Sequence, residues 1–232
     1  MPSATEIRRS ARQAGLLYLA MSILAIIGYF YVHRLFFVSG DPAATARNIL
    51  ANERLYRLSM LIALVVQILF ILVVLALYRL FKDVDPNQAR VMVALVGTGI
   101  AAQFAGFVLN ATPLVLLSGA EYSSAISRPQ LEALSYASFS LAGRQGEMLT
   151  ALWGLWLFPF ATLTIKSGFL PKFLGVLLII SGIAYVLSCV AGFAFPEYVA
   201  TVRKLAMPFY FGEFIVVLWL AFIGANPRNA DA

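Results

Sequence analysis

The sequence predicts an all-α protein, a polytopic membrane helical bundle of about six transmembrane helices with two interfacial amphipathic helices. Apolar residues make up 61% of the 232 residues and charged residues only 12%, whereas soluble domains contain about 45–50% and about 25%. Several apolar runs approach the roughly 20 residues that cross a hydrocarbon core. In lipid such runs must be helical, because only a helix satisfies its own backbone polar groups. The alternating segments of about ten residues that are typical of a membrane β-barrel do not occur in this sequence.

Polar and proline-containing segments divide the apolar runs. We expect a single transmembrane domain over residues 1–232. The first run is longer than the apolar core of a signal peptide, which predicts an uncleaved first helix. The six expected spans cover residues 12–35, 56–81, 89–117, 144–165, 173–193 and 207–223.

Helix start and stop signals are clearest after the first span. Asp41 followed by Pro42 predicts a capped short helix, since proline suits the first turn and aspartate accepts from free backbone N–H groups. The residues from Ala43 to Arg57 mix charged and apolar side chains and predict the first interfacial amphipathic helix. Pro113 is expected to kink or end the third span.

The stretch from Pro129 to Ile165 is helical in pattern but too long for one span. Gly143 and Gly146 are expected to break it. The part up to Leu141 would then be the second amphipathic helix, and the fourth span would begin at Arg144.

The distribution of basic residues predicts the orientation. Six spans place both termini on one side, where the connections are short and basic, and short basic loops favour the cytoplasm. We therefore expect a plasma-membrane protein with both termini cytoplasmic. Membrane orientation also explains the net charge of +6 without a nucleic-acid partner. Membrane lipids are the expected partners.

In each span, polar groups gather toward the end that is expected to lie on the outer side of the membrane. Glu213 lies about six residues into the expected last span, and a carboxylate inside a span usually faces protein or water. Glu147 lies near the start of the fourth span, one helical turn after Arg144, so these two side chains could pair. The sequence thus predicts an outward-facing polar pocket that binds a lipid headgroup or a small polar ligand, with transport as one use. Its candidate ligand-binding residues are Glu213, Glu147, Arg144, Arg57, Tyr210 and Asn110.

The alternative is a structural or accessory membrane protein that acts through helix–helix contacts with itself or a partner. Basic side chains near span ends can reach the headgroups without any ligand. Small residues also recur at four-residue spacing, which favours close helix packing within one bundle or in a homo-oligomer. The two stripes are Gly97, Ala101, Ala105 and Ala184, Ser188, Gly192.

The residue inventory argues against several enzyme classes. There is one histidine, His33, and one cysteine, Cys189, so a zinc site with two or three histidines cannot form within the chain. Neither a nucleophile elbow nor a Walker loop occurs. A shared-proton pair of Glu147 and Glu213 stays open, because no spacing excludes it. We expect no cofactor and no metal, and we name no catalytic residue.

Three segments resemble the bacterial and archaeal membrane proteins grouped as domain of unknown function 4386. The resemblance covers nearly the whole chain. It implies the helical membrane architecture, and because the family has no established activity, it leaves function open. The segments are GDPAATA at 40–46 followed by Asn48-Ile49, SGFLPKFLGVLL at 167–178, and Pro208-Phe209 with Gly212-Glu213 and Leu218-Trp219-Leu220.

Overall fold

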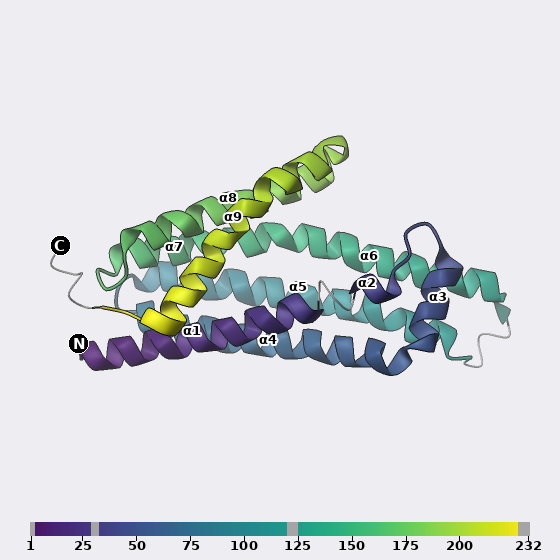
Figure 1. The fold of residues 1–232 in the computed structure, drawn as a ribbon, viewed down its shortest axis with the longest axis horizontal. Helices are drawn as coiled ribbons and strands as arrows, with labels where there is room; N and C mark the ends of the chain where they lie inside the picture. Colours follow the sequence, from purple (N-terminus) through teal and green to yellow (C-terminus); the bar gives the residue numbers. More distant parts are fainter. Residues whose placement is uncertain (1–2, 29–32, 120–124, 227–232) are drawn as a thin grey trace. The chain divides into compact units, whose positions relative to one another are not determined.

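The structure, a computed structural model, is helical throughout the part that it describes, which is residues 3–28, 33–119 and 125–226. No β-strand occurs in these ranges. Figure 1 follows the helices along the chain. They are α1 (Ala4–Ile26), α2 (His33–Phe36), α3 (Pro42–Ala51), α4 (Glu53–Phe81), α5 (Pro86–Leu117), α6 (Arg128–Leu155), α7 (Leu157–Lys166), α8 (Lys172–Ala194), a 3₁₀ turn (Pro196–Tyr198), α9 (Val199–Leu218) and a π-helical end (Trp219–Ile223).

Five helical segments are long and apolar enough to cross a membrane, which confirms the predicted fold class of a helical membrane bundle. Helix α1 is not among the five, and part of the expected first span, residues 29–32, lies outside the described residues. The five segments are Glu53–Phe81, Pro86–Leu117, Arg128–Lys166, Lys172–Ala194 and Pro196–Ile223.

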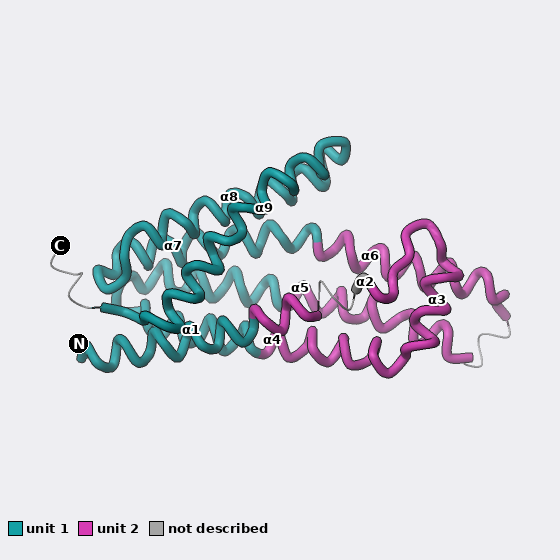
Figure 2. Tube along the Cα trace, in the orientation of Figure 1, with its two compact units in different colours: residues 1–21, 69–100, 147–232 teal, residues 22–68, 101–146 magenta. Residues whose placement is uncertain are grey.

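The chain divides into two compact units (Figure 2). Unit 1 comprises residues 1–21, 69–100 and 147–232, and unit 2 comprises residues 22–68 and 101–146. Helices α1, α4, α5 and α6 each contribute residues to both units.

Local signals placed several helix ends correctly. Asp41 caps α3, its carboxylate accepting from the Ala44 backbone N–H at 2.8 Å, with proline in the first turn. Helix α4 ends at Phe81 and α5 ends at Leu117, both as expected. Pro113 lies inside α5, which continues four residues beyond it.

The expected break at Gly143 and Gly146 is wrong. Helix α6 runs without interruption from Arg128 to Leu155, so the segment up to Leu141 is its first part and not a separate helix. The interruption falls at Trp156, between α6 and α7. Pro159 explains it, since proline has no N–H to donate to the carbonyl four residues earlier, that of Leu155. A glycine inside a helix lowers its stability but removes no backbone hydrogen bond.

The expected start of the last span at residue 207 is also wrong. Helix α9 begins at Val199, so Arg203 and Lys204 lie within the helix and not in a polar connection. Pro208 is inside the helix as well. Lys and Arg are good helix formers, and their charge alone does not end a helix.

Helix α8 makes close backbone contacts in unit 1. It packs against α7 and α9. A Cβ added to Gly212 of α9 would lie 2.7 Å from Ser181 Oγ, and one added to Gly182 would lie 3.0 Å from the Gly154 carbonyl oxygen. Small residues at these positions let the helices approach to backbone contact, the usual basis of helix association in lipid.

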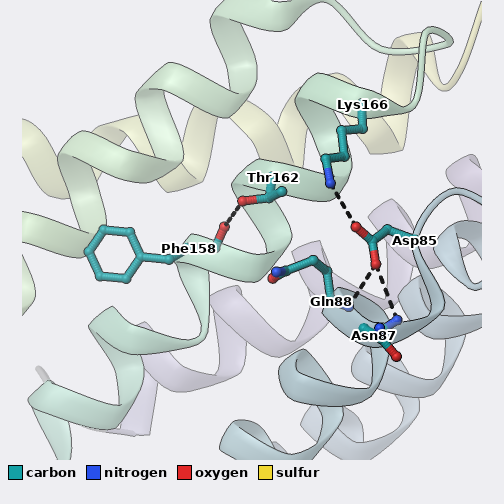
Figure 3. A network of polar contacts seen from close by, with 6 residues as sticks. All are labelled: Asp85, Asn87, Gln88, Phe158, Thr162 and Lys166. Atoms are coloured by element: carbon teal, nitrogen blue, oxygen red, sulfur yellow. Dashed lines mark hydrogen bonds and ion pairs between the residues drawn. The ribbon is translucent and has the colours of Figure 1, made fainter.

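A polar network ties the start of α5 to the end of α7 in unit 1 (Figure 3). Lys166 Nζ donates to an Asp85 carboxylate oxygen at 2.7 Å, and the other oxygen accepts from the backbone N–H groups of Asn87 and Gln88. These three donors lower the pKa of Asp85 below its ordinary value, with the Lys166 hydrogen bond as the largest cause. The carboxylate thus caps α5 and binds α7 at the same time.

Candidate functional site

The strongest candidate site in unit 1 is built around Glu213 on α9. The close contact of Gly212 with α8 brings the two backbones together. There Ser181 Oγ accepts from the Glu213 backbone N–H at 3.1 Å and donates to the Phe209 carbonyl oxygen at 2.7 Å. The backbone that carries the carboxyl group is therefore fixed by a serine of the neighbouring helix.

The Glu213 carboxyl group lies beside two tyrosines on two other helices. The Tyr18 hydroxyl of α1 donates a hydrogen bond to Oε1, and the Tyr185 hydroxyl of α8 is a neighbour of the same carboxyl group. Tyr18 is buried, with 1% of its surface exposed, and its ring lies 6.0 Å from that of Trp156. The carboxyl group thus joins α1, α8 and α9.

Tyr210 belongs to the same cluster through Tyr185. The two rings stack with centroids 4.5 Å apart. The Tyr210 hydroxyl lies 2.5 Å from Ser188 Oγ, which also donates to the Ala184 carbonyl oxygen. Tyr210 is one turn before Glu213 and supports the ring of a tyrosine that holds the carboxyl group.

Within the described residues, no ion pair includes Glu213. An ionised carboxylate can accept about four hydrogen bonds, and the Tyr18 hydroxyl supplies one. Burying a charge without a counter-charge is costly. Among the described residues, no such counter-charge is paired with this carboxyl group.

Glu147 forms an ion pair, but not with the residue that the sequence suggested. Its carboxylate binds Arg203 of α9 at 2.6 Å, whereas the expectation was Arg144. Arg144 is exposed on α6. A partner one turn away on the same helix was possible, but the contact between α6 and α9 decides the pairing.

Glu147 and Glu213 do not share a proton. Arg203 precedes Glu213 by ten residues on α9, about 15 Å along the helix axis. Each carboxyl group has its own set of partners. The open possibility of a carboxyl pair is thereby closed.

The earlier start of α9 also changes the depth of Glu213. It lies 14 residues after Val199, about 21 Å along the helix at 1.5 Å per residue, compared with about 9 Å from the expected start. It lies about 15 Å before Ile223, the last residue of the π-helical end. Glu213 is therefore near the middle of the apolar segment Pro196–Ile223.

The other predicted site residues lie in unit 2 with partners of their own. Arg57 forms an ion pair with Glu53 at 2.7 Å on the exposed side of α4. The Asn110 side chain donates to the Gly106 carbonyl oxygen, and the backbone carbonyl oxygen of Asn110 accepts from the Tyr56 hydroxyl at 2.7 Å. Of the six candidates, the structure brings Tyr210 and Glu213 into one cluster.

Sequence reasoning missed Tyr18, Tyr185 and Ser181. The available signal was chemical: a tyrosine inside an apolar span needs a partner for its hydroxyl group. Glu213 is 195 positions from Tyr18, so no local sequence pattern could have predicted that these two residues pair. No group of three or more metal-ligating side chains occurs in the described part of the chain.

Comparison with known proteins identifies a family. The model of the family described as "Domain of unknown function (DUF4386)" matches residues 13–224. The chain belongs to the DUF4386 family. The match covers all the transmembrane candidates and ends one residue after the π-helix. No curated protein and no solved structure matches this DUF4386 chain.

Proposed function

We propose that this DUF4386 protein is a multi-pass membrane protein that binds a small polar ligand with a positively charged group at Glu213. One observation carries the proposal: a carboxyl group near the middle of an apolar helix is held by tyrosines of two other helices and has no basic partner among the described residues. Ionisable groups at such positions usually mark a ligand or ion pathway.

The ligand that this site favours is small. Because Glu213 lies about 21 Å from one end of its helical segment and about 15 Å from the other, a free amine reaches it more easily than the ammonium group of a lipid at the interface. The aromatic rings of Tyr18, Tyr185 and Tyr210 suit an organic cation, which rings of this type attract through their faces. Use of this site for transport is part of the proposal.

The membrane topology that we propose has six crossings. Arg12 of α1 donates to the Phe222 carbonyl oxygen, Gly15 packs against Ala221, and Tyr18 donates to Glu213, so residues 12–18 of α1 run antiparallel to residues 213–222. If α9 crosses the membrane, α1 crosses it beside α9. With the five other segments this gives an even number, and the short basic connections favour a plasma-membrane protein with cytoplasmic ends.

One observation favours the alternative, a protein that acts by assembly. Gly97, Ala101 and Ala105 of α5 are exposed, and a Cβ at Gly97 would meet nothing within 4 Å. This stripe is free to pack against another chain. The second stripe is used internally, since Ala184 and Ser188 are buried.

The decisive experiment measures thermal stabilisation of the full chain in lipid nanodiscs. Ethanolamine and choline are the cationic probes, and glycerol is the uncharged control. At about 100 times its Kd a ligand stabilises the folded state by about 2.7 kcal/mol, which raises Tm by roughly 5–10 °C for a chain of this size. Comparing nanodiscs with and without phosphatidylethanolamine shows whether the amine that stabilises the protein belongs to a lipid headgroup or to a free small molecule.

The variant Glu213→Gln should fold and lose the response to the amines. Glu147→Gln is the matched control, because it changes another helical glutamate of unit 1, one with an ion-pair partner of its own, and should keep the response. An unchanged response in Glu213→Gln would refute the site. No response in any variant, together with a defined oligomer that a Gly97→Leu substitution breaks, would favour assembly.

A further inference from the structure

Unit 2 contains a cavity of about 90 Å³ between α1, α2, α4, α5 and α6. Its enclosed space would hold about three water molecules at their share of liquid volume. The cavity is half open, so a longer molecule could enter with one end. All residues that line the cavity belong to unit 2, whereas the residues of the Glu213 cluster belong to unit 1.

The apolar wall of the cavity is a well-packed aromatic cluster. Phe36, Tyr56 and Phe139 line it, and each is at most 3% exposed. The rings of Phe36 and Tyr56 meet edge to face with centroids 4.9 Å apart. These rings are fixed by their neighbours, so the cavity is not simply space into which a loose side chain could turn.

Gln103 supplies the polar part of the lining. It is 7% exposed and faces the cavity, and within the described residues its amide makes no hydrogen bond. The other polar side chains of the lining each donate one hydrogen bond within the fold. The Tyr56 hydroxyl donates to the Asn110 backbone carbonyl oxygen, Ser59 Oγ to the Tyr56 carbonyl oxygen, and the Asn110 amide to the Gly106 carbonyl oxygen. A buried amide without a partner is unfavourable, and in an apolar helix bundle it calls for a guest that hydrogen bonds.

No residue in the lining carries a formal charge at neutral pH. Burying a charged ligand there would be costly because nothing neutralises it. The Gln103 amide offers one acceptor oxygen and two N–H donors. We infer that this cavity binds an uncharged amphiphile, with its apolar part against Phe36, Tyr56 and Phe139 and its hydroxyl or carbonyl oxygen at Gln103.

The test uses the full chain in nanodiscs and a photoreactive octanol that carries a diazirine on its chain. Peptide mass spectrometry locates the labelled residues. Labelling should fall on the cavity lining, and unlabelled 1-octanol should compete roughly tenfold better than octane, as one hydrogen bond predicts. Octylammonium and octanoate should compete poorly because they are charged.

Two variants change the site in different ways. Gln103→Leu should abolish the preference for octanol over octane. Ala63→Phe, which fills the cavity, should abolish labelling of the lining. Gln67→Leu is the matched control, since Gln67 is a buried glutamine of unit 2 that does not line the cavity. Gel filtration checks that each variant is folded, and Gln103→Leu keeps the test valid if Ala63→Phe does not fold.

The outcomes separate this site from the Glu213 site. Octanol labelling that persists in Glu213→Gln supports an independent site. If native mass spectra show a bound glyceride, the amphiphile in the cavity is a membrane lipid. If no glyceride is bound but octanol still labels the lining, the ligand is a free amphiphile. Labelling that avoids the lining, or an octanol preference that survives in Gln103→Leu, would show that the cavity holds only water.

Discussion

At the scale of single residues, hydroxyl groups decide how this chain accommodates an acid inside an apolar helix. Tyr18 donates to the Glu213 carboxyl group, Tyr185 is its neighbour, and Ser181 fixes the backbone that carries it. A neutral donor stabilises a carboxylate without introducing a second buried charge, whose own desolvation would be costly. The proposed cationic ligand would supply the counter-charge that these neutral groups do not.

We expect Tyr18→Phe to destabilise the protein by about 1–3 kcal/mol, because a hydrogen bond to an acidic group is lost and no water replaces it. Tyr210→Phe should cost less, since the hydroxyl group of Tyr210 does not contact the carboxyl group. Thermal unfolding of both variants in the same detergent gives the comparison. If both variants lost the same stability, the hydrogen bond to Glu213 would contribute no more than an ordinary tyrosine hydrogen bond.

The pH dependence of stability should include a contribution from Asp85. Its pKa is below the ordinary value of 3.8 in the folded protein, so its ion pair with Lys166 stabilises the fold fully above that value. This stability is lost as the pH falls from 3.8 through the lowered pKa. Asp85→Asn should be less stable than the parent chain at pH 7, and the difference should shrink as the pH falls below 3.8. A difference that is constant over this range would assign the effect to packing.

At the scale of helices, proline and glycine have different effects in this chain. Pro159 separates α6 from α7, whereas α6 continues through Gly143 and Gly146. Glycine matters where two backbones meet, as at Gly212, whose added Cβ would lie 2.7 Å from Ser181 Oγ. At Gly143 an added Cβ would meet nothing within 4 Å. The same residue type is therefore a packing requirement in one helix and a weak point in the other.

A pair of substitutions tests this difference. Gly143→Ala should stabilise the protein by about 0.5–1 kcal/mol, because alanine restricts the unfolded chain and favours the helix. Gly212→Leu should destabilise it by about 1–3 kcal/mol through overpacking against α8. Unfolding midpoints measure both changes. Opposite signs are expected, and destabilisation by Gly143→Ala would mean that another surface covers this position.

Sequence reasoning succeeded where the signal was local. The Asp41 cap and the ends at Phe81 and Leu117 depend on a few neighbouring residues, and each was predicted. The break at Trp156 also has a local cause, Pro159, but the break was expected at Gly143 and Gly146. The partners of Glu213 and Glu147 come from other helices, and packing between helices chooses among many polar groups in ways that no single-sequence pattern records.

At the scale of the whole molecule, the proposed number of crossings depends on the pairing of the first and last helices. Helix α1 falls short of an apolar span in the described residues, yet its residues from Arg12 to Tyr18 run antiparallel to the last helical segment. Because two antiparallel neighbours share the same range of depth, the proposal of six crossings places both ends of the chain on one side of the membrane.

Cysteine accessibility can test the six crossings. In a chain with Cys189 replaced by alanine, single cysteines at Ser3 and Asn226 should react with a membrane-impermeant maleimide from the same side, and one at Ser39 from the other. The expected side for the two ends is the cytoplasm. Reaction of Ser3→Cys and Asn226→Cys from opposite sides would leave five crossings and refute the topology.

The contact between Tyr18 and Glu213 also has a consequence for biosynthesis. The two residues are 195 positions apart. At about 5–20 residues per second, the ribosome makes Glu213 roughly 10–40 s after Tyr18. During that time α1 is present without the carboxyl group to which its tyrosine donates in the complete chain. A nascent chain that stops before α9 therefore lacks this contact between its first and last helices, a difference by which quality control could distinguish unfinished chains from complete ones.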